Sequence, residues 1–188
     1  GGRINIGPAL SPNGKYVAFL SEKGLFSIDL YIADAVTGEI VGNIHSATKS
    51  GHLDELNFIE SAGTWSPRSD KLAFVGVRKG SNVLVIKDLK GKLLESFEID
   101  GVPAFSNPAW SPDGKSIVVA GLKNGQVDLY QVFLRNKKVV QLTSDKYSEM
   151  SPAWNADGTK LTFATDQLSM DRKDARWTFN LATMDFSV

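Results

Sequence analysis

The sequence predicts an all-β fold built from four copies of one antiparallel hairpin. The copies are PALSPNGKYVAFL from Pro8, TWSPRSDKLAFV from Thr64, PAWSPDGKSIVVA from Pro108 and PAWNADGTKLTFA from Pro152. Each joins two apolar segments by Ser, Pro, Asp and Gly, the residues that tight turns favour. Successive units are 55, 45 and 44 residues apart, counted between Ser11, Ser66, Ser111 and Asn155. A turn-rich β repeat of this length predicts a β-propeller of four-stranded antiparallel blades. Helical repeats of similar period are excluded because no window places apolar residues at i, i+3, i+4 and i+7.

The turns divide the chain into four repeats, at approximately residues 8–62, 63–107, 108–151 and 152–188. We expect residues 1–188 to form a single propeller domain or part of a larger propeller of six or more blades. No fourth strand is evident after Phe186, and no complementary strand is evident before Pro8. The sequence therefore predicts a fragment of a longer polypeptide.

In the first repeat, the predicted elements follow the alternation of apolar and polar residues. Ile28, Leu30 and Ile32 alternate with polar or small neighbours, as expected for a strand with two unlike faces. We predict loops at Gly1–Gly7 and Ser21–Gly24 and strands at Pro8–Leu10, Lys15–Leu20, Phe26–Ala33 and Ile40–Ile44.

The remaining repeats follow the same layout. After the second turn we predict strands at Lys71–Val77, Asn82–Asp88 and Lys92–Ile99. After the third we predict Lys115–Ala120, Val127–Leu134 and Lys138–Thr143. The fourth repeat begins at Pro152 and continues through Lys160–Thr165 and Trp177–Phe186.

The composition excludes several classes of partner. The 21 basic and 21 acidic side chains cancel, so no basic field favours nucleic acid or an anionic membrane surface. The absence of cysteine excludes disulfides, thiolate metal sites and a cysteine nucleophile. No apolar stretch approaches membrane-spanning length, and Gly1–Pro8 lacks the features of a signal peptide. We therefore expect no membrane insertion, and either a mature or trimmed chain or a cytosolic one.

Propeller geometry assigns seven loops to one rim, opposite the Ser-Pro-Asp-Gly turns. They are Glu22–Gly24, Ser46–Ser61, Arg78–Gly80, Asp100–Ser106, Lys123–Gly125, Ser144–Ser151 and Gln167–Arg176. The longer first interval places an insert between blades one and two, in a region that contains both histidines, His45 and His52. Because loops on a rigid scaffold commonly carry binding function, we expect this rim to bind a protein partner.

Two loop clusters are candidate binding residues. His52, Asp54 and Glu55 could coordinate a metal or contact a partner, but a solvated loop is the favoured interpretation, so we predict no metal site. Asp171 and Arg172 lie in a charged loop that could contact a partner, and there too a solvated loop tip is favoured.

Two sets of residues at equivalent repeat positions are expected to stabilise the fold and not to bind a ligand. Asp29 and Asp128 could line a polar channel, but we favour a role in bonding backbone amides and tying neighbouring strands. Trp65, Trp110 and Trp154 each precede a turn, so blade packing is favoured over ligand stacking.

The sequence contains none of the motifs that would indicate catalysis or a nucleotide cofactor. G-x-S-x-G, H-E-x-x-H, G-x-x-x-x-G-K-[ST] and G-x-G-x-x-G are all absent. Neither histidine accompanies a serine in a recognisable triad motif. We therefore predict that this chain is not an enzyme and binds no cofactor.

The chain resembles the WD-like propeller repeats of the TolB family in three features. These are the PAWSPDG turn, the phenylalanines that follow the turns, and the two Asp-Leu-Tyr strands at Asp29 and Asp128. Gln141–Trp154 is similar to the junction between successive repeats there. Arg68-Ser69, Asn82-Val83, Asn155-Ala156 and Asn180 depart from the pattern. The resemblance implies a non-catalytic protein-interaction scaffold of the bacterial periplasm or cell envelope.

Two alternatives remain open. The chain could be the gating propeller of a prolyl-oligopeptidase-like serine peptidase whose catalytic domain lies outside these residues. The chain also resembles propellers that are linked to an outer-membrane protein, in the segments GGRINIGPALSPNGKY and FIESAGTWSP.

Overall fold

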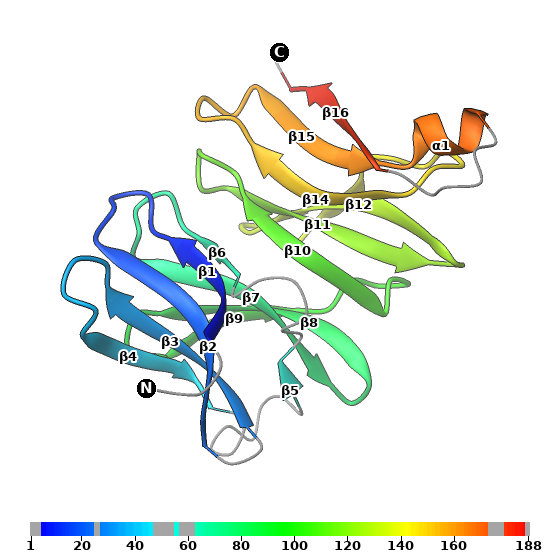
Figure 1. The fold of residues 1–188 in the computed structure, drawn as a ribbon. Helices are drawn as coiled ribbons and strands as arrows, with labels where there is room; N and C mark the ends of the chain where they lie inside the picture. The colour runs from blue at the N-terminus through cyan, green and yellow to red at the C-terminus, as the bar shows by residue number, and fades with distance from the viewer. Residues whose placement is uncertain (1–4, 25–26, 47–54, 57–62, 173–178, 187–188) are drawn as a thin grey trace. The chain divides into compact units, whose positions relative to one another are not determined.

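The structure, a computed structural model, describes residues 5–24, 27–46, 55–56, 63–172 and 179–186. In these residues the fold is all-β apart from one short helix (Figure 1). The chain divides into two compact units, Gly1–Glu98 and Ile99–Val188. Each unit contains two antiparallel sheets, so the four predicted repeats each give one sheet.

The first unit contains the sheets of the first two repeats. The first sheet has the order β1-β2-β3-β4, with β1 at Asn5–Leu10, β2 at Tyr16–Gly24, β3 at Ser27–Asp34 and β4 at Ile40–His45. The second has the order β5-β7-β8-β9, with β5 at Glu55–Leu56, β7 at Lys71–Arg78, β8 at Ser81–Asp88 and β9 at Leu93–Phe97. A further short strand, β6 at Thr64–Trp65, also pairs with β7.

The second unit contains the sheets of the last two repeats. The third sheet has the order β10-β11-β12-β13, with β10 at Ala104–Trp110, β11 at Ser116–Lys123, β12 at Gln126–Phe133 and β13 at Val139–Gln141. The fourth has the order β14-β15-β16, with β14 at Glu149–Trp154, β15 at Lys160–Thr165 and β16 at Asn180–Asp185. The helix α1, Gln167–Arg172, follows β15.

Several predicted loops are regular structure instead. The predicted loop Ser21–Gly24 is the end of β2, which pairs with β3 as far as Gly24 opposite Ser27. The loop predicted over Gly1–Gly7 contains the start of β1, and the predicted rim loops contain β5 and the starts of β10 and β14. The predicted loop Gln167–Arg176 contains α1, whose first turn is closed by the N–H of Met170 donating to the Asp166 carbonyl.

Proline interrupts the first strand of three sheets at the same place. Pro8, Pro108 and Pro152 each lie at a shift of register between the first strand and the second. Proline has no N–H to donate to a ladder, so it is confined to bulges and edges. The residue before each proline has a positive φ, 61° at Gly7, 50° at Asn107 and 53° at Ser151. The Pro-Ala pairs of the repeat therefore mark bulges.

The predicted turns form even where the sequence departs from the repeat. In the first turn the Ser11 hydroxyl oxygen accepts the N–H of Tyr16 at 2.9 Å. Asn155 replaces this serine in the fourth turn, and its side-chain oxygen accepts the equivalent N–H, that of Lys160, at 2.8 Å. In the second turn Ser69 takes the glycine position with φ 58°. The substitutions therefore preserve the turn geometry.

Each unit has its own apolar core. In the first unit, side chains of β2, β3, β4, β7 and β8 pack together with Trp65, and Leu72 and Ile32 are fully buried. In the second, a cluster includes Leu129 and Leu161, which are also fully buried. Removing such a leucine side chain typically costs about 2–5 kcal/mol of stability.

Candidate functional site

The predicted site residues fall into two groups. His52 and Asp54 lie outside the described residues, and of Glu55 only the backbone is described, in β5 opposite Val77. Asp171 and Arg172 form the last residues of α1, a helix where a loop was predicted. The two groups belong to different units, so each is considered within its own unit.

Asp171 joins α1 to the loop between β13 and β14. Its Oδ1 accepts a hydrogen bond from the Tyr147 hydroxyl at 2.7 Å and one from Lys146 Nζ at 3.2 Å. These bonds to Tyr147 and Lys146 hold the pKa of the Asp171 carboxyl below its usual range. Asp171 remains exposed, so its carboxylate stays within reach of a partner.

The turn between β11 and β12 is tied to the same loop. Gln126 Nε2 donates to the Tyr147 carbonyl at 2.7 Å and also to the Asp145 carbonyl. These contacts join three segments that propeller geometry assigned to one rim. We call them together the tied rim: the β11–β12 turn with Gln126, residues Asp145–Tyr147, and α1.

Three buried carboxyl groups lie beneath the tied rim. Asp128 accepts hydrogen bonds from Gln141 Nε2 at 3.1 Å and from the Thr143 hydroxyl at 3.4 Å. Asp166 Oδ1 accepts the Ser148 N–H at 2.9 Å. Glu149 Oε1 lies 3.5 Å from the Thr165 hydroxyl, while its Oε2 is buried and has no hydrogen-bond partner among the described residues.

The pKa of Glu149 is raised to about 7, chiefly by burial and also by the negative charges of Asp145, Asp128 and Asp166, while a hydrogen bond from Thr143 acts in the opposite direction. The side chain is only 2% exposed, so its ionised form is poorly solvated. Glu149 can therefore gain or lose a proton near neutral pH. In the part of the chain that the structure describes, no three His, Asp or Glu residues are arranged to hold a metal ion.

A buried lysine occupies the core of the first unit. Lys87 Nζ donates to the Ile44 carbonyl at 2.8 Å and lies 3.5 Å from Nδ1 of His45. Burial, followed by the charge of Lys87, lowers the pKa of His45 to about 4, so this histidine is neutral at physiological pH. His45 is therefore a buried residue at the end of β4. Lys87 was not predicted, although a lysine within the apolar run VLVIKD was the available signal.

The aspartates of the Asp-Leu-Tyr strands tie neighbouring strands together through side-chain hydrogen bonds. Asp29 Oδ2 accepts hydrogen bonds from the Tyr31 hydroxyl and from Asn43 Nδ2, both at 3.2 Å. Asn43 lies on β4, so this contact spans two strands. Asp128 contacts Gln141 of β13 in the same way.

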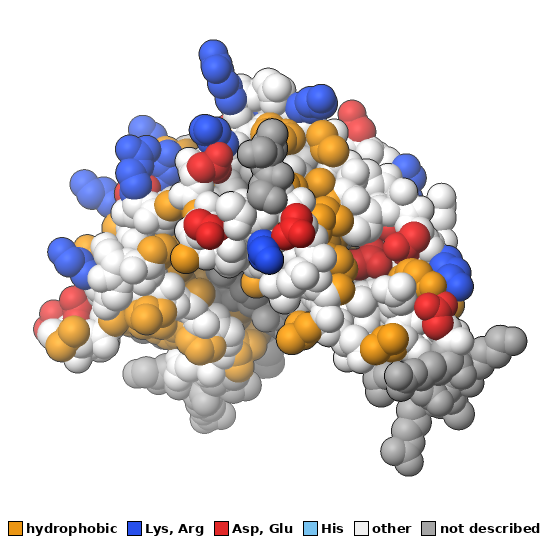
Figure 2. All heavy atoms as spheres, turned by 90° about the horizontal axis from the view of Figure 1, so that it is seen from above, with side chains coloured by type: hydrophobic (Ala, Val, Ile, Leu, Met, Phe, Trp, Pro, Cys, Tyr) orange, Lys and Arg blue, Asp and Glu red, His pale blue; other side chains and the backbone are white. Residues whose placement is uncertain are grey.

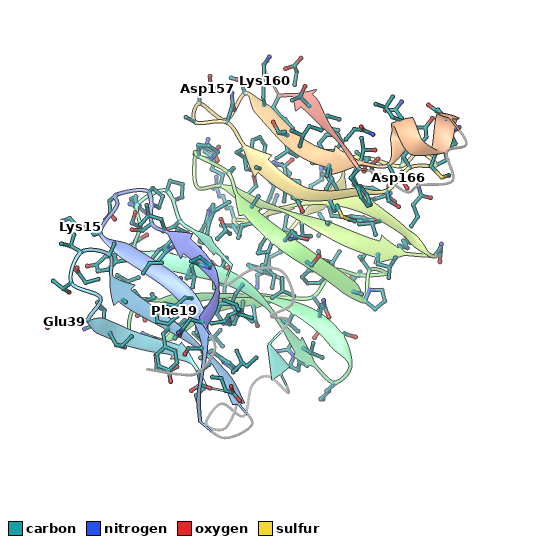
Figure 3. The ribbon with its side chains drawn as sticks, viewed as in Figure 1. Lys15, Phe19, Glu39, Asp157, Lys160 and Asp166 are labelled. Atoms are coloured by element: carbon teal, nitrogen blue, oxygen red, sulfur yellow. The ribbon has the colours of Figure 1, made fainter. Side chains whose placement is uncertain are left out.

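A pocket of about 400 Å³ lies at the other end of the second unit, between the turns of the third and fourth sheets. Figure 3 places Asp157 and Lys160 at this end of the fourth sheet and Asp166 at the opposite end, near α1. The pocket walls include the side chain of Trp154, whose ring lies 4.8 Å from that of Phe186. We call this the Trp154 pocket. It is lined by Ser111, Pro112, Asp113, Lys115, Ser116, Gln131, Phe133, Trp154, Asp157, Gly158 and Phe186.

On the face shown in Figure 2, acidic, basic and apolar side chains all occur. Within the described residues, no helix has both the length and the apolar character needed to cross a bilayer.

Comparison with known proteins identifies the family. Residues 52–170 match the family described as the TolB beta propeller domain. The chain is 30% identical over 141 residues to the Tol-Pal system protein TolB of Ruthia magnifica subsp. Calyptogena magnifica, covering 69% of this chain and 32% of that protein. It is 25% identical over 207 residues to the uncharacterized peptidase YuxL of Bacillus subtilis (strain 168), covering 87% of this chain and 30% of that protein. The chain thus spans about a third of each of these relatives.

The fold agrees with this assignment. The crystal structure of TolB from Acinetobacter baumannii superposes with a TM-score of 0.73 at 20% identity, covering 97% of this chain and 41% of that one. At this identity the likeness concerns the fold alone. Because the family match extends over well more than half of the residues, the chain belongs to the TolB β-propeller family.

Proposed function

We propose that this chain is a non-catalytic scaffold that binds a protein partner through the tied rim. The observation that carries the proposal is the set of hydrogen bonds from Gln126 and to Asp171 that hold three loops together. Loops fixed before binding lose little conformational entropy on association, which favours affinity. The exposed charges of Lys146 and Asp171 provide polar contacts at the edge of such an interface.

The proposal extends to the bacterial envelope. The similarity to a protein named as part of the Tol-Pal system supports a periplasmic or envelope location and an envelope protein as partner. The first residues resemble those of propellers linked to an outer-membrane protein. This resemblance favours a link between the present chain and such a protein.

Site-specific photocrosslinking tests the rim. A benzophenone amino acid is introduced at Lys146 on the tied rim and, as a matched control, at Lys90 in the exposed turn between β8 and β9. Illumination of intact cells, followed by mass spectrometry, is expected to give a discrete adduct from position 146 and none from position 90. Equal adducts at both positions, or none at position 146, would contradict a partner site at the tied rim.

A second candidate function is the propeller domain of a peptidase. The 25% identity to a protein named as a peptidase favours it. In that case the catalytic residues lie in another domain of the full-length protein. Hydrolysis of a fluorogenic peptide by the full-length gene product, abolished by a serine-directed phosphonate, would select the peptidase, whereas inactivity across a peptide library would favour the scaffold.

A further inference from the structure

The first and third turns place two different residues at one equivalent position. Tyr16 and Ser116 each lie five residues after the first serine of their turn. The N–H of Tyr16 donates to the Ser11 hydroxyl oxygen at 2.9 Å, and the N–H of Ser116 donates to that of Ser111 at 3.0 Å. The two side chains therefore start from the same point in their repeats.

In the first unit the tyrosine ring fills the junction between two sheets. The ring of Tyr16 stacks on that of Trp65, with centroids 6.2 Å apart and planes inclined by 19°. Trp65 is only 6% exposed, and its indole N–H donates to the Ala9 carbonyl at 2.8 Å. This junction is closed by an aromatic pair and a hydrogen bond.

The equivalent junction in the second unit is open. Trp154 is the counterpart of Trp65, but Ser116 supplies no ring to stack on it, and the Trp154 pocket lies between them. Trp154 is half-buried, and its indole Nε1 has no hydrogen-bond partner among the described residues. Phe133 lines the pocket as well, yet about 400 Å³ of space remains.

The lining of the pocket favours a planar ring that carries a hydroxyl group. Trp154, Phe133 and Phe186 provide aromatic surface on which a ring can stack. Gln131 and the hydroxyl of Ser111 add polar groups. The carboxylates of Asp113 and Asp157 outnumber the ammonium group of Lys115, which pairs with Asp113, so the charges disfavour an anionic ligand. A phenol satisfies these conditions, because its ring is apolar and its hydroxyl can donate to an oxygen.

We propose that the Trp154 pocket binds a tyrosine side chain of a partner polypeptide, with its ring on Trp154 as the ring of Tyr16 lies on Trp65. The first unit supports the choice of tyrosine as the ligand, because the equivalent position holds Tyr16 there and Ser116 in the second unit. The pocket lies at the opposite end of the fourth sheet from the tied rim, so this site is independent of the proposed function.

Titrations of the indole N–H resonances in ¹⁵N-labelled protein test the proposal. N-acetyl-tyrosinamide and the peptide Gly-Tyr-Gly are the probes, and N-acetyl-alaninamide is the control. Both tyrosine probes are expected to shift the Trp154 signal with saturation in the millimolar range, as befits so small a ligand. In Ser116→Tyr, which fills the pocket from within, affinity is expected to fall at least tenfold.

The reciprocal variant, Tyr16→Ser, keeps the proposal testable even if Ser116→Tyr does not fold. Tyr16→Ser is expected to open the first junction and to add a saturable shift of the Trp65 signal with N-acetyl-tyrosinamide, leaving the response of Trp154 unchanged. The proposal is overturned if no saturable shift of Trp154 occurs, or if Ser116→Tyr binds as well as the parent. Binding of N-acetyl-tyrosinamide without Gly-Tyr-Gly would also overturn it, since the pocket would then admit a free aromatic compound and exclude a chain.

Discussion

Glu149 illustrates how a single buried carboxyl group affects the stability of this protein. Burial raises its pKa to about 7, well above the ordinary value of 4.5. A carboxyl group whose pKa is raised on folding favours the folded state fully only below its unfolded pKa. That stabilisation is then lost as the pH rises through about 7. The ionised Glu149 side chain therefore destabilises the folded state at alkaline pH.

Replacing Glu149 with glutamine removes the buried charge and keeps the shape. We expect Glu149→Gln to raise the free energy of unfolding at pH 8 by roughly 2 kcal/mol, and to have little effect at pH 4.5. Urea unfolding at both pH values measures this difference. Glu98→Gln, at an exposed ion pair with Arg78, is the matched control and should change stability by less than about 1 kcal/mol. Equal effects of Glu149→Gln at the two pH values would contradict the assignment.

Lys87 and His45 form a second residue-scale test. Lys87→Met keeps the aliphatic stem and removes the positive charge 3.5 Å from the imidazole. The pKa of His45 should then rise above about 4, but stay below 6.5 because burial is the larger cause of its depression. Titration of the imidazole C–H signals by NMR follows this change. A pKa that does not move would show that the lysine charge does not reach the ring.

Neither residue-scale site could be predicted from the sequence. The partners of Glu149 come from β12, from the loop before β14 and from the end of β15, and only the fold brings them together. Lys87 contacts residues more than 40 positions earlier in the chain. Local patterns carry no information about such contacts, whereas the turns, which depend on residues five positions apart, were predicted correctly.

At the scale of elements, the second turn shows how a substitution is accommodated. Ser69 has φ 58°, a conformation that favours glycine, and its hydroxyl oxygen accepts the N–H of Asn13 from the first turn at 3.1 Å. Serine at this position thus causes some backbone strain, but its side chain makes a contact between the two sheets. Repeat patterns predicted the turn and could not predict this contact.

Two substitutions at Ser69 separate the contact from the strain. Ser69→Ala keeps the strain and removes the acceptor, so it should lower the free energy of unfolding by about 1 kcal/mol. Ser69→Gly removes both, and relief of strain should offset much of the loss. Chemical denaturation of both variants compares them. If Ser69→Gly were the less stable of the two, the φ value would not be a source of strain.

Strand boundaries were predicted less well than strand existence. The repeat phase placed all four sheets, because the turn residues and the alternation recur in each copy. The ends of β2 and the start of β10 were missed because Ser, Gly and Asn occur there within paired strands. The helix α1 was missed because six residues are too few to show helical periodicity.

At the scale of the whole molecule, the sequence predicted the fold class and the family, and of the proposed tied rim it singled out Asp171 but neither Tyr147 nor Gln126. Grouping the loops by rim placed Asp171 on the same rim as Ser144–Ser151, and the hydrogen bond to Tyr147 agrees with that grouping. The Trp154 pocket was not predicted, because it arises from the difference between two equivalent positions and becomes visible only when their surroundings are compared.

The central claim is that the hydrogen bonds of the tied rim prepare it for a protein partner. The most direct test is the calorimetric affinity of the crosslinked partner for the parent protein and for Tyr147→Phe, which removes only the hydroxyl bonded to Asp171. We predict about tenfold weaker binding with an unchanged unfolding midpoint, because the loop would then be ordered only on association. An affinity equal to that of the parent would contradict the claim.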